Sequence, residues 1–281
     1  MLLSTHRRRR SYNPDHGDAS RKRAGREHRP VTFKDHFSGH AGDYATARPT
    51  YPAALFDWLV ARCPDRELAW DAGCGNGQAS LALARRFRRV HASDPSAEQI
   101  ANARSDRRVS YRVEPAEACS LPDASAALIT VAQAYHWIDH ARFAAEARRV
   151  LVPAGLLAVF NYARSQVDGG TVDRIFGDLH DRTLAADWPP ERQHAIAEFR
   201  ALPFPFTELG AVPDFELRCD WTLAQYLAYL RSWSASRRHL ARTGRDPVAA
   251  IAPAMAAAWG DPDTPRPVRW PLMLRVGRRP A

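Results

Sequence analysis

Short apolar runs alternate with amphipathic stretches from about residue 51 to residue 160. Within 51–63, apolar residues recur at helical spacing behind Pro52, a residue suited to a first helical turn, and predict a helix. The same periodicity predicts further helices over 79–87, 98–104 and 143–151. Compact apolar runs predict strands over 68–70, 90–93, 109–113, 128–132 and 156–160.

Strands that alternate with helices in this way form βαβ units, whose strands pair in parallel. Beyond residue 161 the rhythm changes, and 165–210 holds only short apolar pieces between Asp, Pro and Gly. A strand over 215–221, a long helix over 223–240 and a last strand over 268–276 follow. We therefore expect an α/β fold with a seven-stranded, mostly parallel sheet, helices on both faces, an antiparallel last strand and a C-terminal helical elaboration.

Composition divides the chain at about residue 30. The 281 residues are 45% hydrophobic, as in ordinary soluble globular proteins, and carry a formal net charge of +9. Residues 1–30 hold nine Lys and Arg against three acidic residues, so they carry +6 and the other 251 residues only +3. Because 1–30 also lack apolar periodicity, we expect a disordered basic tail there. The folded domain is expected over 31–281, with its core over 52–162, a substrate-side elaboration over 163–265, and the last strand and C-terminus over 266–281.

Charge, cysteines and hydropathy narrow the class of protein. Positive charge gathered in a tail argues against nucleic-acid binding, although binding through the tail stays an alternative. The four cysteines lack the paired spacing of a metal site, and we expect no metal. The apolar run over 155–160 is far too short to span a bilayer, and no apolar segment follows the first charges as in a signal peptide. We therefore expect a cytoplasmic protein that does not bind membranes.

Three glycines lie between the first predicted strand and the helix after it. Gly73, Gly75 and Gly77 leave room for a ligand to approach the backbone closely, and they present amides at a helix N-terminus. Position 78 is glutamine, whereas the dinucleotide-binding fingerprint places a small residue there. Asp71, two residues before the first glycine, suits a cationic ammonium or sulfonium group better than a pyrophosphate.

Asp94 ends the second predicted strand. A carboxylate at this strand end can accept hydrogen bonds from both hydroxyls of an adenosine ribose. Because more than one cofactor contains this ribose, Asp94 does not choose among them, and capping of the following helix is its alternative role.

Five runs in a fixed order carry a resemblance to a known family: AWDAGCGNGQASLALA, SDPS, PAEACSLPD, VAQAYHWID and RRVLVPAGLLAVF. This order resembles the class I S-adenosylmethionine (SAM)-dependent methyltransferases of the type-11 group, which have a Rossmann-like fold. Three further stretches resemble the trans-aconitate methyltransferase branch: FSGHAGDYATARPTYP, YLRSWSASRRHL and VRWPLMLRVGRR. The resemblance implies SAM as the cofactor and a small-molecule methyl acceptor.

The resemblance also implies which residues bind the cofactor. They are Asp71, Gly73, Gly75, Gly77, Asp94, Ala116, Glu117 and Gln133. The first three hold the methionine end of SAM, and the third glycine shapes the turn. The second aspartate binds the ribose, the Ala-Glu pair borders the adenine, and the glutamine lies near the transferred methyl group.

Six residues are candidates for the acceptor side: Tyr44, Arg48, His136, Trp137, Arg231 and Trp233. The resemblance implies that the first two lie on an N-terminal segment that closes over the site. Either arginine can grip an acceptor carboxylate with two parallel hydrogen bonds. The tryptophans would exclude water from the acceptor, and the alternative for both is packing in the core.

The branch predicts a carboxylate acceptor of the trans-aconitate type, which needs no general base. A phenolic or other natural-product hydroxyl or an amine is the alternative, and it needs a base, for which His136 is the candidate. A nicotinamide (NAD)-dependent oxidoreductase is a more distant alternative, against which Gln78 and Asp71 argue. The sequence does not determine the oligomeric state.

Overall fold

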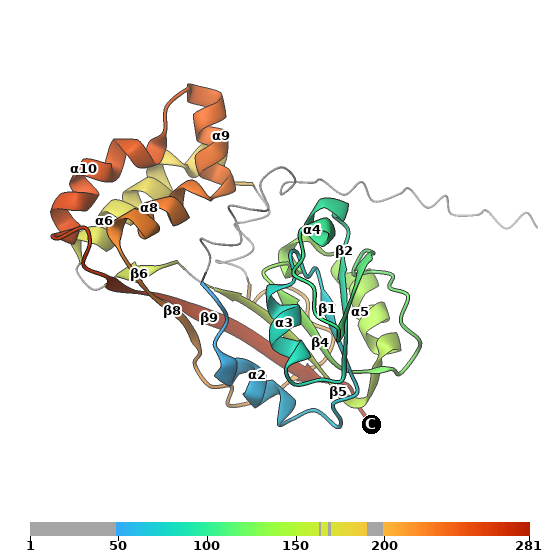
Figure 1. Cartoon of the computed structure of the whole chain (residues 1–281). Helices are drawn as coiled ribbons and strands as arrows, with labels where there is room; N and C mark the ends of the chain where they lie inside the picture. Colours follow the sequence, from blue (N-terminus) through green and yellow to red (C-terminus); the bar gives the residue numbers. More distant parts are fainter. Residues whose placement is uncertain (1–48, 163, 168–169, 190–198) are drawn as a thin grey trace, which may run out of the picture. The chain divides into compact units, whose positions relative to one another are not determined.

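Five parallel strands form one half of a mixed sheet in the computed structural model, which describes residues 49–162, 164–167, 170–189 and 199–281 (Figure 1). The strands pair in the order β3-β2-β1-β4-β5. Their bounds are β1 (Leu68–Ala72), β2 (Arg89–Asp94), β3 (Val109–Val113), β4 (Ala126–Ala132) and β5 (Leu151–Tyr162). All five predicted strands are therefore present, and several extend beyond the apolar runs that predicted them.

Helices cover both faces of this half of the sheet. Leu156, Ala158 and Phe160 of β5 pack with α2 (Ala53–Val60) and α3 (Gln78–Ala84). The alternate residues Leu157 and Val159 pack with α5 (His140–Val150). Because successive strand residues point to opposite faces, this alternation buries a strand that is apolar throughout. The short helix α4 (Ala97–Ala101) follows β2.

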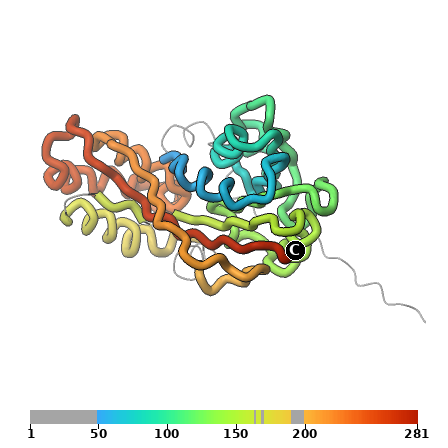
Figure 2. The backbone as a smooth tube through the Cα atoms, turned by 90° about the horizontal axis from the view of Figure 1, so that it is seen from below, coloured from blue at the N-terminus to red at the C-terminus, as the bar shows by residue number. Residues whose placement is uncertain are grey.

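The last strand, β9 (Arg266–Arg278), is antiparallel to every strand with which it pairs. Its C-terminal half pairs with β5 and β7 (Thr207–Glu208), and its N-terminal half pairs with β6 (Gln166–Val167) and β8 (Glu216–Trp221). Figure 2 shows β9 as one continuous red tube. The strand path is 3-2-1-4-5-9-6, a seven-stranded mixed sheet with an antiparallel last strand, as expected. Strand β6 was not predicted, and the predicted strand over 215–221 is β8, which pairs with β9 beside this path, as does β7.

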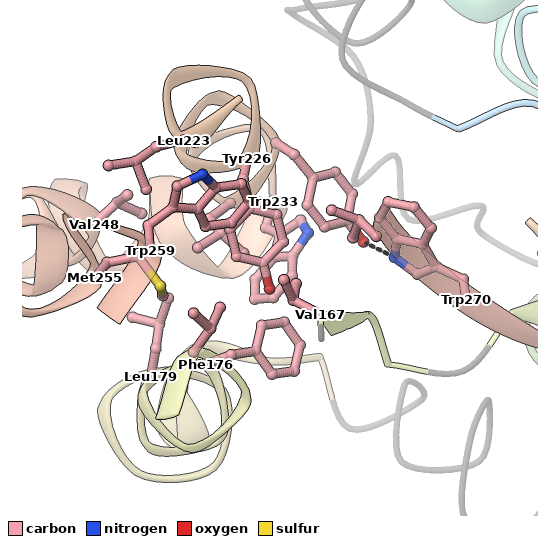
Figure 3. Packing of buried hydrophobic residues seen from close by; sticks show 14 of the residues in the cluster. Val167, Phe176, Leu179, Leu223, Tyr226, Trp233, Val248, Met255, Trp259 and Trp270 are labelled. Carbon is pink, nitrogen blue, oxygen red and sulfur yellow. Dashed lines mark hydrogen bonds between the residues drawn. The ribbon is translucent and has the colours of Figure 1, made fainter. Parts of the chain in front are cut away.

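A second hydrophobic core lies on the N-terminal half of β9 (Figure 3). It contains aromatic side chains from several helices together with Trp270, whose Nε1 donates to Tyr229 Oη at 3.0 Å. The helices are α6 (Thr171–Asp178), α8 (Leu223–Arg231), α9 (Ser234–Thr243) and α10 (Pro247–Trp259), with short turns η2 (Leu179–Thr183) and η3 (Ala185–Asp187). These helices form the predicted C-terminal helical elaboration. Strand β9 contributes Trp270 to this second core and Val276 to the core between the parallel strands and α2 and α3.

The single helix predicted over 223–240 is wrong, because the chain breaks at Trp233. The residue has extended backbone angles, φ −69° and ψ 139°, and separates α8 from α9. Ser236 Oγ donates to the carbonyl of Leu230 at 2.8 Å and so satisfies one of the last acceptors of α8. The break lets the indole of Trp233 enter the second core, where it is 4% exposed.

The predicted division into a tail over 1–30 and a domain over 31–281 stays a prediction, since 1–48 lie outside the described residues. Tyr44 and Arg48 lie there as well. Within the ranges described, no helix combines the length and apolar character that crossing a bilayer requires.

Candidate functional site

The glycine-rich loop connects the carboxyl end of β1 to the N-terminus of α3. All three glycines have positive φ, and Gly77 is the N-cap of α3. A Cβ at Gly73, where φ is +68°, would lie 2.6 Å from the Cβ of Ala134, and a Cβ at Gly77 would overlap the hydroxyl of Tyr111. The backbone angle disfavours a side chain at both positions, and at Gly73 the close approach of Ala134, just after β4, excludes it as well.

Asp94 ties this loop to the next one. Its Oδ2 accepts the amide of Gly75 at 2.9 Å, and its Oδ1 accepts the amide of Ser96 at 2.9 Å. The N-cap of α4 is Ser96, whose Oγ accepts the amide of Gln99 at 3.3 Å, so capping is not the role of Asp94. Asp94 therefore fixes the glycine-rich loop to the start of the segment after β2.

Asp71 is fully buried at the end of β1. Ser80 Oγ donates to its Oδ2 at 2.6 Å, and Thr130 Oγ1 donates to its Oδ1 at 2.8 Å. Burial nevertheless raises the pKa of Asp71 to about 6, and the hydroxyls oppose this rise only in part. A buried carboxylate without a cation beside it among the described residues suits a positively charged ligand.

We expect the Asp71→Asn variant to change how stability depends on pH. The folded protein holds the Asp71 proton up to about pH 6, whereas an unfolded chain releases it near 3.8. The folded state therefore binds more protons in this window, and the free energy of unfolding falls as pH rises through it, by up to about 3 kcal/mol. Urea unfolding from pH 4 to 7.5 should show wild type losing stability relative to Asp71→Asn. Parallel curves for the two proteins would contradict the raised pKa.

Gln133 follows the last residue of β4 and has a strained backbone. Its φ is +58°, uncommon for a residue with a side chain, and its amide donates to the carbonyl of Phe160 at 2.9 Å. The side-chain Nε2 is buried and has no hydrogen-bond partner among the described residues. Strain combined with an unsatisfied buried donor is typical of a ligand-binding position.

His136 and Trp137 lie in the short turn η1 (Tyr135–Trp137) directly after Gln133. Their ring centroids are 4.8 Å apart, and both side chains are half-buried. Tyr135 anchors the turn, because its ring is fully buried and its hydroxyl donates to the carbonyl of Pro203. The turn therefore holds His136 and Trp137 close to Gln133, and their contact with an acceptor stays a prediction.

Ala116 and Glu117 follow β3, next to the end of β2. The amide of Glu114 donates to the carbonyl of Asp94 at 3.2 Å, which places the start of this segment beside the ribose candidate. Ala116 is buried, and Glu117 Oε1 accepts the amide of Asp139 at 2.8 Å. The carboxyl ends of β1 to β4 thus gather the eight predicted cofactor residues at one edge of the sheet, where α/β proteins bind ligands.

Arg231 and Trp233 have other partners. Arg231 ends α8, and its Nε donates to Asp246 Oδ2 at 3.0 Å, which joins α8 to the N-cap of α10. Trp233 packs against Phe176 and Trp188 in the second core, with ring centroids 5.6 Å and 5.4 Å away. Trp233 is therefore a core residue, the alternative that its helical spacing had left open.

Three polar side chains at the site were not predicted. Ser80 and Thr130 hold the carboxylate of Asp71, and Gln78 Nε2 donates to the carbonyl of Pro49 at 3.0 Å. Thr130 carried a signal in the sequence, because it is the one polar residue in the apolar run 126–132. Among the described residues, no group of three His, Cys, Asp or Glu side chains could hold a metal ion.

The chain is similar to several proteins assigned as methyltransferases. Residues 70–159 match the model of a family described as a methyltransferase domain. A Dictyostelium discoideum protein assigned as a methyltransferase is 30% identical over 237 residues, which cover 83% of this chain and 90% of that protein.

Two further relatives bear on the cofactor and on the fold. A Mycobacterium tuberculosis protein assigned as an S-adenosylmethionine-dependent methyltransferase is 35% identical over 138 residues, which cover 47% of this chain and 48% of that protein. A solved structure from Anaeromyxobacter dehalogenans, assigned as a type II methyltransferase, is 49% identical and superposes with a TM-score of 0.79. The match covers 83% of this chain and 99% of that one.

Proposed function

Since the chain belongs to the SAM-dependent methyltransferases, we propose that it transfers a methyl group to a carboxylate of a small anionic acceptor. The family excludes the NAD-dependent oxidoreductase as an alternative. The acceptor class rests on the resemblance of three stretches to the trans-aconitate methyltransferase branch. Neither nucleic acid nor a membrane is part of this proposal, and the cytoplasmic location stays a prediction.

The residues at the carboxyl edge of the sheet fit SAM. Gly73, Gly75 and Gly77 would admit its methionine end, and the buried carboxylate of Asp71 would supply the negative charge that a cationic ligand requires. Asp94, which ends β2 and accepts the amide of Gly75 in the glycine-rich loop, would also accept from the ribose hydroxyls.

The observation that carries the site assignment is the buried Nε2 of Gln133. A buried donor without a partner costs about 1–3 kcal/mol, so a ligand that accepts from it recovers this free energy. A carboxylate offers only acceptors and matches such a donor. We assign Gln133 to the carboxylate that lies nearest the transferred methyl group.

The mechanism requires alignment more than proton transfer. The cofactor supplies a methyl group that its positive sulfur already activates toward a nucleophile. Gln133 and the turn that follows it would orient the acceptor, and the half-buried ring of Trp137 would exclude water from it. A carboxylate nucleophile is ionised near neutral pH, so no side chain needs to remove a proton.

A second candidate function is methylation of a phenol, another hydroxyl or an amine. The position of His136 favours it, because this ring lies in the turn after Gln133, where a general base could reach the acceptor. The two candidate functions predict different effects of His136→Asn on turnover. The asparagine is polar but cannot act as a base. Turnover survives this change for a carboxylate acceptor and is lost for a hydroxyl or amine.

We expect Arg48→Met to lower kcat/KM about 10- to 100-fold for a poly-acid acceptor. The methionine is similar in size, but it cannot donate charged hydrogen bonds to an acceptor carboxylate. Transfer of radiolabelled methyl from SAM to a panel of carboxylic acids, phenols and amines identifies the acceptor and measures this loss. Arg231→Met is the matched control, since its guanidinium already pairs with Asp246. Methylation of phenols alone would show that the carboxylate proposal is wrong. Wild-type kcat/KM in Arg48→Met would show that Arg48 does not bind the acceptor.

A further inference from the structure

Side chains of β2 and α5 help to hold the segment over 114–123, which connects β3 to β4. On the β2 side, Glu114 Oε2 lies 3.0 Å from Nε2 of the buried His91 and accepts the amide of Ser120 at 3.1 Å. The segment contains no helix or strand, so these contacts replace the backbone ladder that would otherwise fix it.

Two charged residues of α5 hold the other side of the segment. Glu146 Oε1 accepts the amide of Cys119 at 2.8 Å. The guanidinium of Arg149 donates to the carbonyls of Leu121 at 2.7 Å and Cys119 at 3.2 Å, and to Asp123 Oδ1 at 2.8 Å. Glu146 and Arg149 therefore satisfy the amide of Cys119 and the carbonyls of Cys119 and Leu121.

Glu146 and Arg149 also bind each other, one helical turn apart. Arg149 Nε donates to Glu146 Oε2 at 2.9 Å and Nη2 donates to Oε1 at 2.7 Å, a two-pronged ion pair. The Glu146 side chain is 11% exposed and that of Arg149 is 32% exposed. The guanidinium holds the pKa of Glu146 below its usual range, so the pair stays charged at neutral pH.

Both ends of α5 take part in this arrangement. At the N-terminus of α5, Glu117 Oε1 accepts the amide of Asp139, the N-cap residue. At the C-terminus, the carbonyl of Arg149 accepts the amide of Ala124 at 2.8 Å, where the chain turns into β4 with a φ of +45°. The pair Ala116–Glu117 therefore lies in a stretch of chain that α5 fixes on both sides.

We propose that Glu146 and Arg149 are positioning residues for the adenine end of the cofactor. The inference rests on the proposed placement of Ala116 and Glu117 beside the adenine. A segment fixed before the ligand arrives loses less conformational entropy on binding than a segment that the ligand must order. The ion pair thus sets the affinity for the base without touching the cofactor.

The experiment measures selectivity for the base. Calorimetric titration gives the Kd of S-adenosylhomocysteine and of S-inosylhomocysteine, which carries hypoxanthine in place of adenine. In Arg149→Met the Kd of the adenine ligand should rise about tenfold, the equivalent of one neutral hydrogen bond. The Kd of the inosine ligand should rise less, so the preference for adenine falls. Acceptor KM at saturating SAM should not change.

Arg148→Met is the matched control on the same helix. Its exposed guanidinium donates to the carbonyl of Pro205 at 3.0 Å and does not reach 114–123, so both Kd values should stay at wild type. Glu146→Gln keeps the size of the side chain and removes its charge. Arg149→Lys keeps a charged donor that Arg149→Met lacks. Both should give intermediate preferences, and they decide the question if Arg149→Met does not fold.

The outcomes separate this inference from the function on which it rests. If the variants of Glu146 and Arg149 weaken the binding of both ligands equally, or of neither, these residues have only a structural role and the inference is overturned. If wild type itself does not prefer adenine, the placement of Ala116 and Glu117 fails and the inference fails with it. The carboxylate acceptor is tested by methyl transfer alone, so its failure leaves these titrations unaffected.

Discussion

Gly73→Ala is expected to lower the affinity for S-adenosylhomocysteine by at least about 30-fold. At a φ of +68° an L-residue costs roughly 1–2 kcal/mol. The added Cβ would also lie 2.6 Å from the Cβ of Ala134, a rigid neighbour, and such overpacking costs about 1–3 kcal/mol more. Relief requires the glycine-rich loop to move away from the residue after Gln133, which separates two parts of the proposed site. Calorimetry measures the loss.

Two further variants divide the loss into its causes. Gly75→Ala has a similar backbone angle, φ +54°, but the nearest atom to its Cβ would be Gln99 Oε1 at 3.7 Å, an ordinary contact. The affinity of Gly75→Ala therefore measures the effect of backbone strain alone, without a steric clash. The double variant Gly73→Ala/Ala134→Gly removes the clash and keeps the strain, so it should recover affinity to about the level of Gly75→Ala. Equal affinities for the single and the double variant would show that the contact with Ala134 is not the cause.

Periodicity was sufficient for most of the parallel half of the sheet because β1, β2 and β4 are buried on both faces. A run such as 126–132 is apolar at all but one position, and no tertiary detail is needed to see it as a strand. The pattern of residues put Asp71 and Asp94 at strand ends, whereas Gln133 was implied only by the resemblance to the methyltransferases. The structure brings these three residues to the carboxyl edge of the parallel strands, and their contacts with the cofactor stay predictions.

The C-terminal elaboration could not be predicted in the same detail. Local periodicity extended one helix through Trp233, but burial of its indole against side chains from α6 and η3 favours a break in the backbone there. Helix α10 was missed because its sequence is rich in alanine and contains Pro253, which blurs the contrast between its faces. Arg231 looked available for a carboxylate only because its partner, Asp246, is distant in sequence.

The hydroxyls around Asp71 show a second limit. Thr130 lies 59 residues from Asp71 in the sequence, and the two meet because β1 and β4 are neighbours in register. The sequence motif shows where the carboxylate of Asp71 lies in the chain. Which hydroxyls donate to it depends on the order of the strands in the sheet. The pKa of Asp71, and with it the affinity for a cation, is therefore a property of the fold rather than of the glycine-rich motif.

Asp94→Ala should weaken binding of S-adenosylhomocysteine roughly tenfold to several hundredfold, because each hydrogen bond to a charged group contributes on the order of 1.5–3 kcal/mol. The substitution also removes the acceptor for the amides of Gly75 and Ser96, so a loss of affinity alone does not identify a ribose contact. Ser96→Ala serves as the control for the local fold, since it removes the cap of α4 and leaves the carboxylate in place.

The ribose contact is isolated by pairing Asp94→Ala with a ligand that lacks the hydroxyl. Wild type should bind S-adenosylhomocysteine about tenfold or more tightly than its 2′-deoxy analogue, because the analogue leaves the carboxylate without that donor. In Asp94→Ala the two ligands should bind equally, since the group that distinguished them is gone. The coupling between the two changes measures the contact itself and cancels damage to the loop, which affects both ligands alike. If the variant still prefers the ribose, another residue reads the hydroxyl, and Asp94 serves only to join the glycine-rich loop to the segment after β2.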